Sequence, residues 1–374
     1  MVRRKLLAAL GIFTLSATVG GLAHAADTAA PAESDAKLYQ QTVDRGVEYL
    51  ITKGVQEDGS YGKDLGPGMA SICTDALLRQ GRSPDDPAVA KSLKWIKTFV
   101  HSDGGIYSPD SPVKNYETSL AVLAFTDANG DGRYTTLLKN ADKFLNGIQW
   151  GGEESDVKYG GAGYGKHKRP DLSNTGFFMD ALKAAGNGPN DEAVKRALVF
   201  VSRCQNFESP ANTTPYAAKN PDGGFYYTPT VEGGSEAGTT ADGGLRSYGS
   251  MTYTGLKSMI YAGVKADDPR VKAAVGWVKK NYTLDANPGM PEREAGLFYY
   301  YNTFSKALAA LGQDEIVDAE GRSHNWRHEL LEAIAKRQKP DGSWVNSSHR
   351  WLEGNPNLVT AYCLISLANS KAKH

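Results

Sequence analysis

Apolar residues recur along much of the chain with the spacing of one face of an α-helix. Val89, Leu93, Ile96 and Val100 follow one another in steps of four, three and four, which places all of them on one side of a helix. The same spacing recurs at Val194, Leu198 and Val201 and at Val271, Val275 and Val278. Each of these segments predicts an amphipathic helix with one buried face.

A second kind of segment is apolar on more than one face and carries a threonine near its start. The six threonines are Thr74, Thr118, Thr175, Thr254, Thr303 and Thr360. Segments of this kind are typical of helices that are buried on all sides. A glycine soon follows four of them, at Gly81, Gly186, Gly263 and Gly312, and glycine readily adopts the left-handed conformation that ends a helix.

Short glycine-containing loops separate the two kinds of helix, at residues 56–61, 103–107, 158–161, 222–225, 295–298 and 338–344. A unit that recurs six times, roughly every 57 residues, indicates a repeat protein. We therefore predict an all-α chain, with six helical hairpins over residues 37–370. Hairpins can stack as an open solenoid or close into a ring. Closure is favoured because the last helix is as apolar as the internal ones, whereas an open solenoid ends in polar capping repeats.

Two of the loops resemble the Gln-Trp motif of squalene and oxidosqualene cyclases. Residues 338–344, Gln-Lys-Pro-Asp-Gly-Ser-Trp, match it, and residues 56–61, Gln-Glu-Asp-Gly-Ser-Tyr, are a softened copy. The Gly-Gly-aromatic loops followed by Thr-x-x-x-Leu helices are similar to the repeats of protein prenyltransferase β-subunits. The resemblance to this prenyltransferase and squalene cyclase repeat family implies an (α/α)6 toroid whose inner helices surround an aromatic-lined cavity. It also implies that Gln338 and Trp344 stabilise the fold.

The acid motif of squalene-hopene cyclases is degraded in this sequence. Those enzymes protonate an alkene with the middle Asp of Asp-x-Asp-Asp-Thr, and residues 171–175 here are Asp-Leu-Ser-Asn-Thr. The hydroxyl of Ser173 is far too weak an acid for that step. Asp171 is the candidate catalytic residue if burial raises its pKa. The alternative is that Asp171 only caps the inner helix.

The chain has no evident requirement for a cofactor. None of its three cysteines has an aspartate two residues before it, so the Asp-x-Cys zinc ligands that a prenyltransferase would need are missing. Residues 127–135 resemble the start of a calcium loop, with Asp127, Asn129 and Asp131 at the first three ligand positions. The twelfth position is Leu138 in place of a bidentate Glu. A weak structural calcium site and a plain Asx-rich turn both remain open.

Candidate ligand-binding residues concentrate in the fourth repeat, which has the longest and most glycine-rich loop. They are Tyr227, Arg246, Tyr248 and Tyr253. Glycine lets backbone approach a ligand, Arg246 is able to pair with an anionic head group, and tyrosine faces pack on apolar chains or stabilise cations. Alternatively, the tyrosines plug one end of the toroid and Arg246 forms an internal ion pair. The repeat pattern places three further candidates on the same rim, Tyr300, Trp351 and Glu353.

The N-terminus predicts export. Residues 3–5 are basic, residues 6–19 are largely apolar, and residues 23–25, Ala-His-Ala, suit signal peptidase. We expect a signal peptide at 1–25, a flexible leader at 26–36, and a periplasmic or extracellular protein. No later apolar stretch is long enough to span a membrane. The chain has 42 basic and 42 acidic residues, which argues against a nucleic-acid partner.

Three functions are compatible with this sequence. The first is binding of an isoprenoid-like apolar substrate in a central cavity, with or without cyclase-like activity. The second is a carbohydrate-active enzyme, a glycosidase or polysaccharide lyase, which needs paired carboxylates such as Asp75, Glu117 or Asp171. The third is a non-catalytic scaffold that binds a partner protein at its rim.

Overall fold

The computed structural model describes residues 29–166, 168–230 and 234–371. The signal peptide predicted at 1–25 lies outside these residues. Six outer helices are α1 (Ala29–Tyr49), α3 (Pro87–Lys97), α5 (Thr135–Ile148), α7 (Glu192–Arg203), α9 (Pro269–Lys280) and α11 (Trp326–Lys336). Six inner helices are α2 (Gly66–Arg79), α4 (Lys114–Asp127), α6 (Leu172–Ala184), α8 (Gly249–Tyr261), α10 (Leu297–Leu311) and α12 (Pro356–Ser370).

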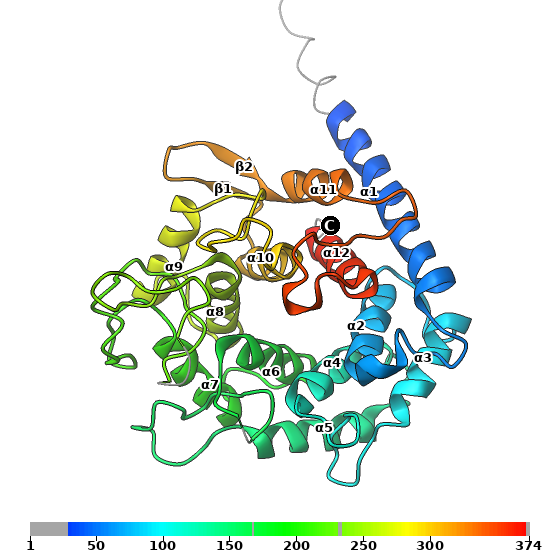
Figure 1. Cartoon of the computed structure of the whole chain (residues 1–374), viewed down its shortest axis with the longest axis horizontal. Helices are drawn as coiled ribbons and strands as arrows, with labels where there is room; N and C mark the ends of the chain where they lie inside the picture. Colours follow the sequence, from blue (N-terminus) through cyan, green and yellow to red (C-terminus); the bar gives the residue numbers. More distant parts are fainter. Residues whose placement is uncertain (1–28, 167, 231–233, 372–374) are drawn as a thin grey trace, which may run out of the picture.

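The inner helices form a closed ring inside a ring of outer helices (Figure 1). Each inner helix packs on the next one along the chain, and α12 packs on α2. In the outer layer α1 packs on α11, so the first and last hairpins are neighbours. The prediction of an all-α toroid of six hairpins is confirmed.

The elements outside this pattern are short. They are a π-helical turn at Leu50–Gly54, 3-10 turns at Lys63–Leu65 and Arg350–Leu352, and an antiparallel hairpin of β1 (Glu315–Val317) and β2 (Ser323–Asn325). α1 begins at Ala29, inside the stretch that the sequence suggested to be a flexible leader. Alanine favours helix, and Asp35 is held by His328 of α11, with its Oδ2 2.8 Å from the histidine Nδ1.

The amphipathic pattern determines which helix lies outside. In α3 the buried apolar residues are Val89, Leu93 and Ile96, on one face, whereas nearly all of α4 from Glu117 to Phe125 is buried. Asp86 caps α3 by accepting from the Ala88 amide at 3.2 Å. Proline occupies the next position, where its missing N–H costs nothing.

The recurrent threonines bind the loops to the inner helices. The hydroxyl of Thr118 accepts from the Ile106 amide at 3.0 Å, and that of Thr360 accepts from the Trp344 amide at 3.2 Å. Thr175 does the same in the third repeat. In the fourth repeat this role falls to Thr252, which accepts from the Phe225 amide at 3.0 Å and lies two residues before the Thr254 that the pattern suggested.

Glutamine side chains join successive outer helices around the ring. The Gln338 amide donates to Gly342 O at 2.9 Å and to Thr42 O of α1 at 3.0 Å. Gln205 likewise donates to Gly223 O at 2.9 Å and to Arg270 O of α9 at 2.8 Å. Trp344 is fully buried. These contacts give the Gln-Trp loops the stabilising role that the resemblance implied.

No helix within the described parts of the chain is both long and apolar enough to cross a membrane. The three cysteines, Cys73, Cys204 and Cys363, are buried free thiols. Burial raises the pKa of each thiol well above its usual value, so they pack as small apolar residues.

Candidate functional site

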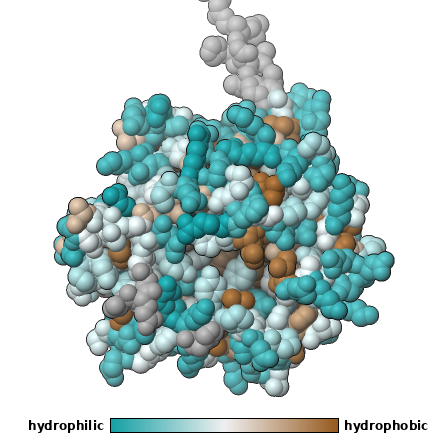
Figure 2. Space-filling view, viewed as in Figure 1, coloured by the Kyte–Doolittle hydropathy of each residue, from teal (hydrophilic) through white to brown (hydrophobic). Residues whose placement is uncertain are grey.

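A cavity of about 310 Å³ opens where the N-terminal ends of the inner helices meet on the ring axis. Its volume is at the lower end of the range of small-molecule sites, about 300–1,000 Å³. Figure 2 shows this face of the molecule, with hydrophobic residues gathered round a hollow near its centre. Each inner helix contributes to the wall, either with its own residues or with those of the loop before it. α10 contributes one residue, and each of the other five contributes more than one.

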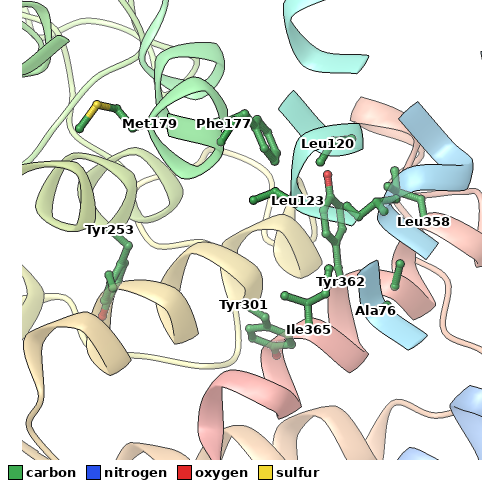
Figure 3. Close-up of a cluster of buried hydrophobic side chains, with 14 of the residues drawn as sticks. Ala76, Leu120, Leu123, Phe177, Met179, Tyr253, Tyr301, Leu358, Tyr362 and Ile365 are labelled. Carbon is green, nitrogen blue, oxygen red and sulfur yellow. The ribbon is translucent and has the colours of Figure 1, made fainter. Parts of the chain in front are cut away.

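Aromatic rings form the inner part of the wall. Tyr116 of α4 meets Phe177 of α6 edge to face, with ring centroids 5.0 Å apart. Phe177 stacks on Tyr299 of α10 at 6.0 Å, and Tyr299 lies 5.9 Å from Tyr362 of α12. Figure 3 shows Phe177 and Tyr362 pointing into the space between their helices. The rings thus form one continuous surface drawn from four helices.

The mouth of the cavity is apolar and partly exposed. Leu65, Trp351 and Leu352 are 37%, 42% and 57% exposed, and all three line the cavity. Trp351 and Leu352 have φ of 52° and 63°, a conformation that costs energy for residues other than glycine. The Arg350 guanidinium lies 4.3 Å above the Trp351 ring. It also pairs with Glu236 at 2.8 Å, which ties this turn to the long α7–α8 loop.

Asp171 is fully buried and caps α6. Its Oδ1 accepts from the Asn174 backbone amide at 2.8 Å, and its Oδ2 accepts from the Asn174 side-chain amide at 2.9 Å. Burial raises the pKa of Asp171 to about 6, against the lowering effect of Asn174 and of Tyr227. Asn174 and Tyr227 line the cavity, and Asp171 stands behind them. It therefore reaches the cavity only through its neighbours.

Ser173 occupies the position of the proton donor in the acid motif of squalene-hopene cyclases. It lines the cavity, and its hydroxyl shares a hydrogen bond of 2.8 Å with the Tyr299 hydroxyl. Burial raises the pKa of Tyr299 above its ordinary value. Neither hydroxyl is a strong acid, so this pair supplies no proton for an alkene.

Glu117 is a carboxyl group on the cavity wall itself. It lies in the first turn of α4 and accepts from the Ser108 hydroxyl at 3.0 Å and the Ser108 amide at 3.3 Å. Burial raises its pKa, although the hydrogen bonds from serine lower it. In the sequence, Glu117 stood out only as one of several carboxylates at inner-helix starts. Glu236, the other carboxylate on the wall, gave no sequence signal because it lies in an irregular loop.

Of the ligand-binding candidates, Tyr227, Tyr248 and Trp351 line the cavity. Arg246 is exposed away from it and donates to Thr239 O at 2.9 Å. Tyr253 is buried between α8 and α10, with its ring 5.0 Å from Phe304. In Figure 3 it lies apart from the group around the axis.

Tyr300 and Glu353 lie near the same rim and serve neighbouring backbone. The Tyr300 hydroxyl donates to Thr283 O at 2.8 Å. Glu353 is fully buried and accepts from the Tyr299 amide at 2.7 Å, so it caps α10 from another segment of the chain. Burial raises the pKa of Glu353 to about 7. A cap that comes from another segment of the chain cannot be recognised from the sequence around the helix.

Ion pairs and one hydrogen bond engage the three ligand-like side chains of the calcium-like turn. Asp127 pairs with Arg79 at 3.2 Å, and Asp131 pairs with Arg133 at 2.6 Å. The Asn129 side chain accepts from the Tyr134 amide at 2.7 Å. These contacts are those of an Asx-rich turn. Across residues 29–166, 168–230 and 234–371, no group of three or more His, Cys, Asp or Glu side chains could hold a metal.

Charged side chains close the other end of the axis. Asp180 of α6 accepts from Lys257 of α8, and from Lys306 of α10 at 2.9 Å. All three are buried, and the two lysines hold the pKa of Asp180 below its usual value despite its burial. The space between them is only about 10 Å³, room for a single water. In the sequence, Lys257 and Lys306 are visible only as single charged residues within apolar helices.

No protein-family model and no curated protein matches this sequence. Among solved structures, the chain is similar to a variant of the type II terpene cyclase MstE from Scytonema in complex with its substrate, geranylgeranyl dihydroxybenzoate. The TM-score is 0.53 at 14% identity, over 90% of this chain and 97% of that chain. This chain has a type II terpene cyclase fold. A second variant of MstE, in complex with the product merosterolic acid A, matches at 14% identity over the same shares, with a TM-score of 0.36.

Proposed function

We propose that this protein binds an apolar, isoprenoid-like small molecule in the axial cavity, outside the cytoplasm. The observation that carries the proposal is the cavity itself, which is lined by a continuous aromatic surface and closed at its inner end. The fold is that of cyclases, one of which was solved with a geranylgeranyl compound bound. Export rests on the sequence of residues 1–25.

The binding energy in this proposal comes mainly from burial of apolar surface. Each methylene group that leaves water contributes about 0.8 kcal/mol. Affinity should therefore rise with the number of isoprene units until the chain outgrows the cavity. The faces of Phe177 and Tyr299 are also suited to stabilising positive charge, which makes cyclase-like turnover the finer hypothesis.

Turnover started by protonation would need an acid other than Ser173. Asp171 stands behind Tyr227, and Glu117 is on the wall. Each has a raised pKa because of burial, so each is protonated in a larger fraction of molecules near neutral pH than an exposed carboxyl group. If turnover occurs, Asp171→Asn and Glu117→Gln identify which carboxyl group supplies the proton.

The other two functions gain less support from this geometry. Asp75, one of the carboxylates considered for carbohydrate chemistry, is paired with Arg79 at 3.0 Å toward the closed end of the axis. Glu117 thus lacks Asp75 as a partner in the cavity, and Glu236, the other carboxylate on the wall, is paired with Arg350 at 2.8 Å. A scaffold would be expected to have a filled centre, and here the centre holds the cavity.

The proposal is tested by binding measurements on the mature protein with farnesol, geranylgeraniol and, separately, oligosaccharides. Native mass spectrometry should detect a one-to-one complex with the isoprenoids. Trp351→Ala should weaken that complex about tenfold, because the indole is part of the wall. Trp95→Ala on outer helix α3 is the matched control and should leave binding unchanged. Binding of oligosaccharides alone would overturn the proposal.

A further inference from the structure

A buried acceptor on the cavity wall has no hydrogen-bond partner among the described residues. It is Oδ1 of Asn174, a side chain that is 2% exposed and lines the cavity. Buried polar atoms are paired in the great majority of cases, and an unpaired acceptor is costly because it has lost its water. The unpaired oxygen therefore points to a donor that arrives with a ligand.

The orientation of this amide is fixed by its neighbour. The side-chain nitrogen of Asn174 donates to Asp171 Oδ2 at 2.9 Å. An ionised carboxylate only accepts hydrogen bonds, so the amide nitrogen must face Asp171 and the amide oxygen must face away from it. Asp171 is thus a positioning residue, which keeps Oδ1 directed at the cavity side.

Donors for a ligand oxygen lie beside this acceptor. Tyr164 and Tyr227 both line the cavity with Asn174, and Tyr227 and Asn174 lie close enough to the Tyr164 hydroxyl to oppose the rise of its pKa on burial. Burial raises the pKa of both tyrosines, so their hydroxyls keep their protons near neutral pH. A ligand hydroxyl placed here is able to donate to Asn174 and accept from a tyrosine.

The charges of the wall argue against an anionic head group. The described residues that line the cavity include Glu117 and Glu236 and no lysine, arginine or histidine. Asp171 lies directly behind Asn174. Of the guanidinium groups behind the wall, Arg350 is already paired with Glu236 at 2.8 Å, and Arg169 lies over the Tyr227 ring at 5.5 Å. A phosphate or carboxylate would be desolvated next to two wall carboxylates with no cation on the wall itself, which is costly.

We propose that the ligand is an isoprenoid-like molecule with one free hydroxyl group, which donates to Asn174 Oδ1. This inference rests on the proposed function, because it names the class of molecule that occupies the same cavity. It assigns the apolar chain to the aromatic surface and the hydroxyl to the Asn174, Tyr164 and Tyr227 side chains.

The experiment compares four probes of one chain length with the wild-type protein: geranylgeraniol, its methyl ether, the corresponding hydrocarbon and geranylgeranyl diphosphate. We expect the alcohol to bind about tenfold more tightly than the ether or the hydrocarbon, because only the alcohol donates to the orphaned acceptor. We expect the diphosphate to bind most weakly. Equal binding of alcohol, ether and hydrocarbon would overturn this inference and leave the proposed function standing. Binding of none would overturn both.

Variants then assign the preference to Asn174. Asn174→Leu removes the acceptor at similar volume, so the alcohol should lose its advantage while hydrocarbon binding is kept. Asn357→Leu is the matched control, since Asn357 also has an unpaired Oδ1 near the start of an inner helix but does not line the cavity. It should keep the preference for alcohol.

Asp171→Asn tests the positioning role. Asparagine caps a helix as well as aspartate. Its side chain both donates and accepts, however, so the Asn174 amide is no longer held in one orientation. The preference for alcohol over ether should fall while the melting temperature and hydrocarbon affinity stay close to wild type. A preference that survives in Asp171→Asn would contradict the role of Asp171, and one that survives in Asn174→Leu would overturn the assignment.

Discussion

At the scale of single residues, His324 lies between two carboxylates outside the cavity. Its Nε2 is 3.0 Å from Asp318 and its Nδ1 is 3.0 Å from Glu329. The ring stacks on Tyr282 at 4.1 Å, and the Tyr282 hydroxyl donates to Glu329 at 2.9 Å. Partial burial lowers the pKa of His324, but the bonds to the two carboxylates raise it more, so the net shift is upward.

This shift predicts a pH-dependent contribution to stability. Because the folded pKa of His324 is raised, the contribution is fully present below the unfolded value of about 6.5 and is lost as pH rises through the folded value. His324→Gln should therefore lower the melting temperature most at acidic pH, with a difference from wild type that shrinks toward alkaline pH. Melting curves between pH 5 and 9 measure this, and a difference that is constant with pH would contradict it.

A second residue-scale prediction concerns Gly160, where the chain approaches the next outer helix. Its φ is 80°, and an added Cβ would lie 1.8 Å from Arg196 O. Gly160→Ala should cost well over the roughly 1–2 kcal/mol of a left-handed alanine, because backbone must also move. Gly186→Ala is the control, with φ of 94° and open space around its Cβ. Urea denaturation of both variants gives the difference, and equal costs would show that the close approach is unimportant.

At the scale of elements, the glutamines that join outer helices explain how the hairpins keep their spacing. Each donates to its own loop and to the following outer helix. The sequence pattern identified this role at Gln338 only. Gln149 and Gln205 were missed because the spacing between glutamine and the Gly-aromatic loop varies, while the hydrogen bonds stay the same.

The joining role predicts a large cost for Gln205→Ala. The variant leaves the buried Gly223 O without a donor and breaks the bond to Arg270 O of α9. A buried unsatisfied group costs about 1–3 kcal/mol, and a lost hydrogen bond adds to that. We expect a loss of about 2–4 kcal/mol in the free energy of unfolding. Gln313→Ala, at an exposed position, should change it little. A loss confined to solubility, with an unchanged unfolding midpoint, would contradict the prediction.

Much of the fold follows from local patterns, and the site follows from them less directly. Alternation of amphipathic and apolar helices, with threonine and glycine at their ends, is enough to predict six hairpins. The side chains that reach the axis depend on how each inner helix is rotated, which periodicity does not specify when all faces are apolar. Tyr248 and Tyr253 illustrate this, since one lines the cavity and the other packs between α8 and α10.

At the scale of the whole molecule, the two ends of the ring axis have opposite chemistry. One end is the apolar mouth at Trp351 and Leu352, and the other is closed by Asp180 with Lys257 and Lys306. Burial lowers the pKa of Lys257 to about 8, although Asp180 opposes this. A ligand is therefore expected to enter and leave through the mouth.

Asp180 is predicted to stabilise the closed end of the ring axis by neutralising its two lysines. Asp180→Asn leaves two buried lysines without a counter-charge, and breaking a buried pair in this way costs about 3–5 kcal/mol. Chemical denaturation should show this loss. Glu192→Gln, which removes the surface partner of Lys195, should have no measurable effect. A mild effect of Asp180→Asn would mean that water already reaches the lysines.

The closure of α12 onto α2 also limits how such a protein can diversify. An open array of hairpins gains or loses a unit at its end without disturbing the others. In a closed circle, adding a seventh hairpin would widen every junction and enlarge the central chamber. Losing one hairpin, so that five remained, would collapse the chamber. New ligand preferences are therefore reached by exchanging single side chains on the inner wall, with the number of units held at six.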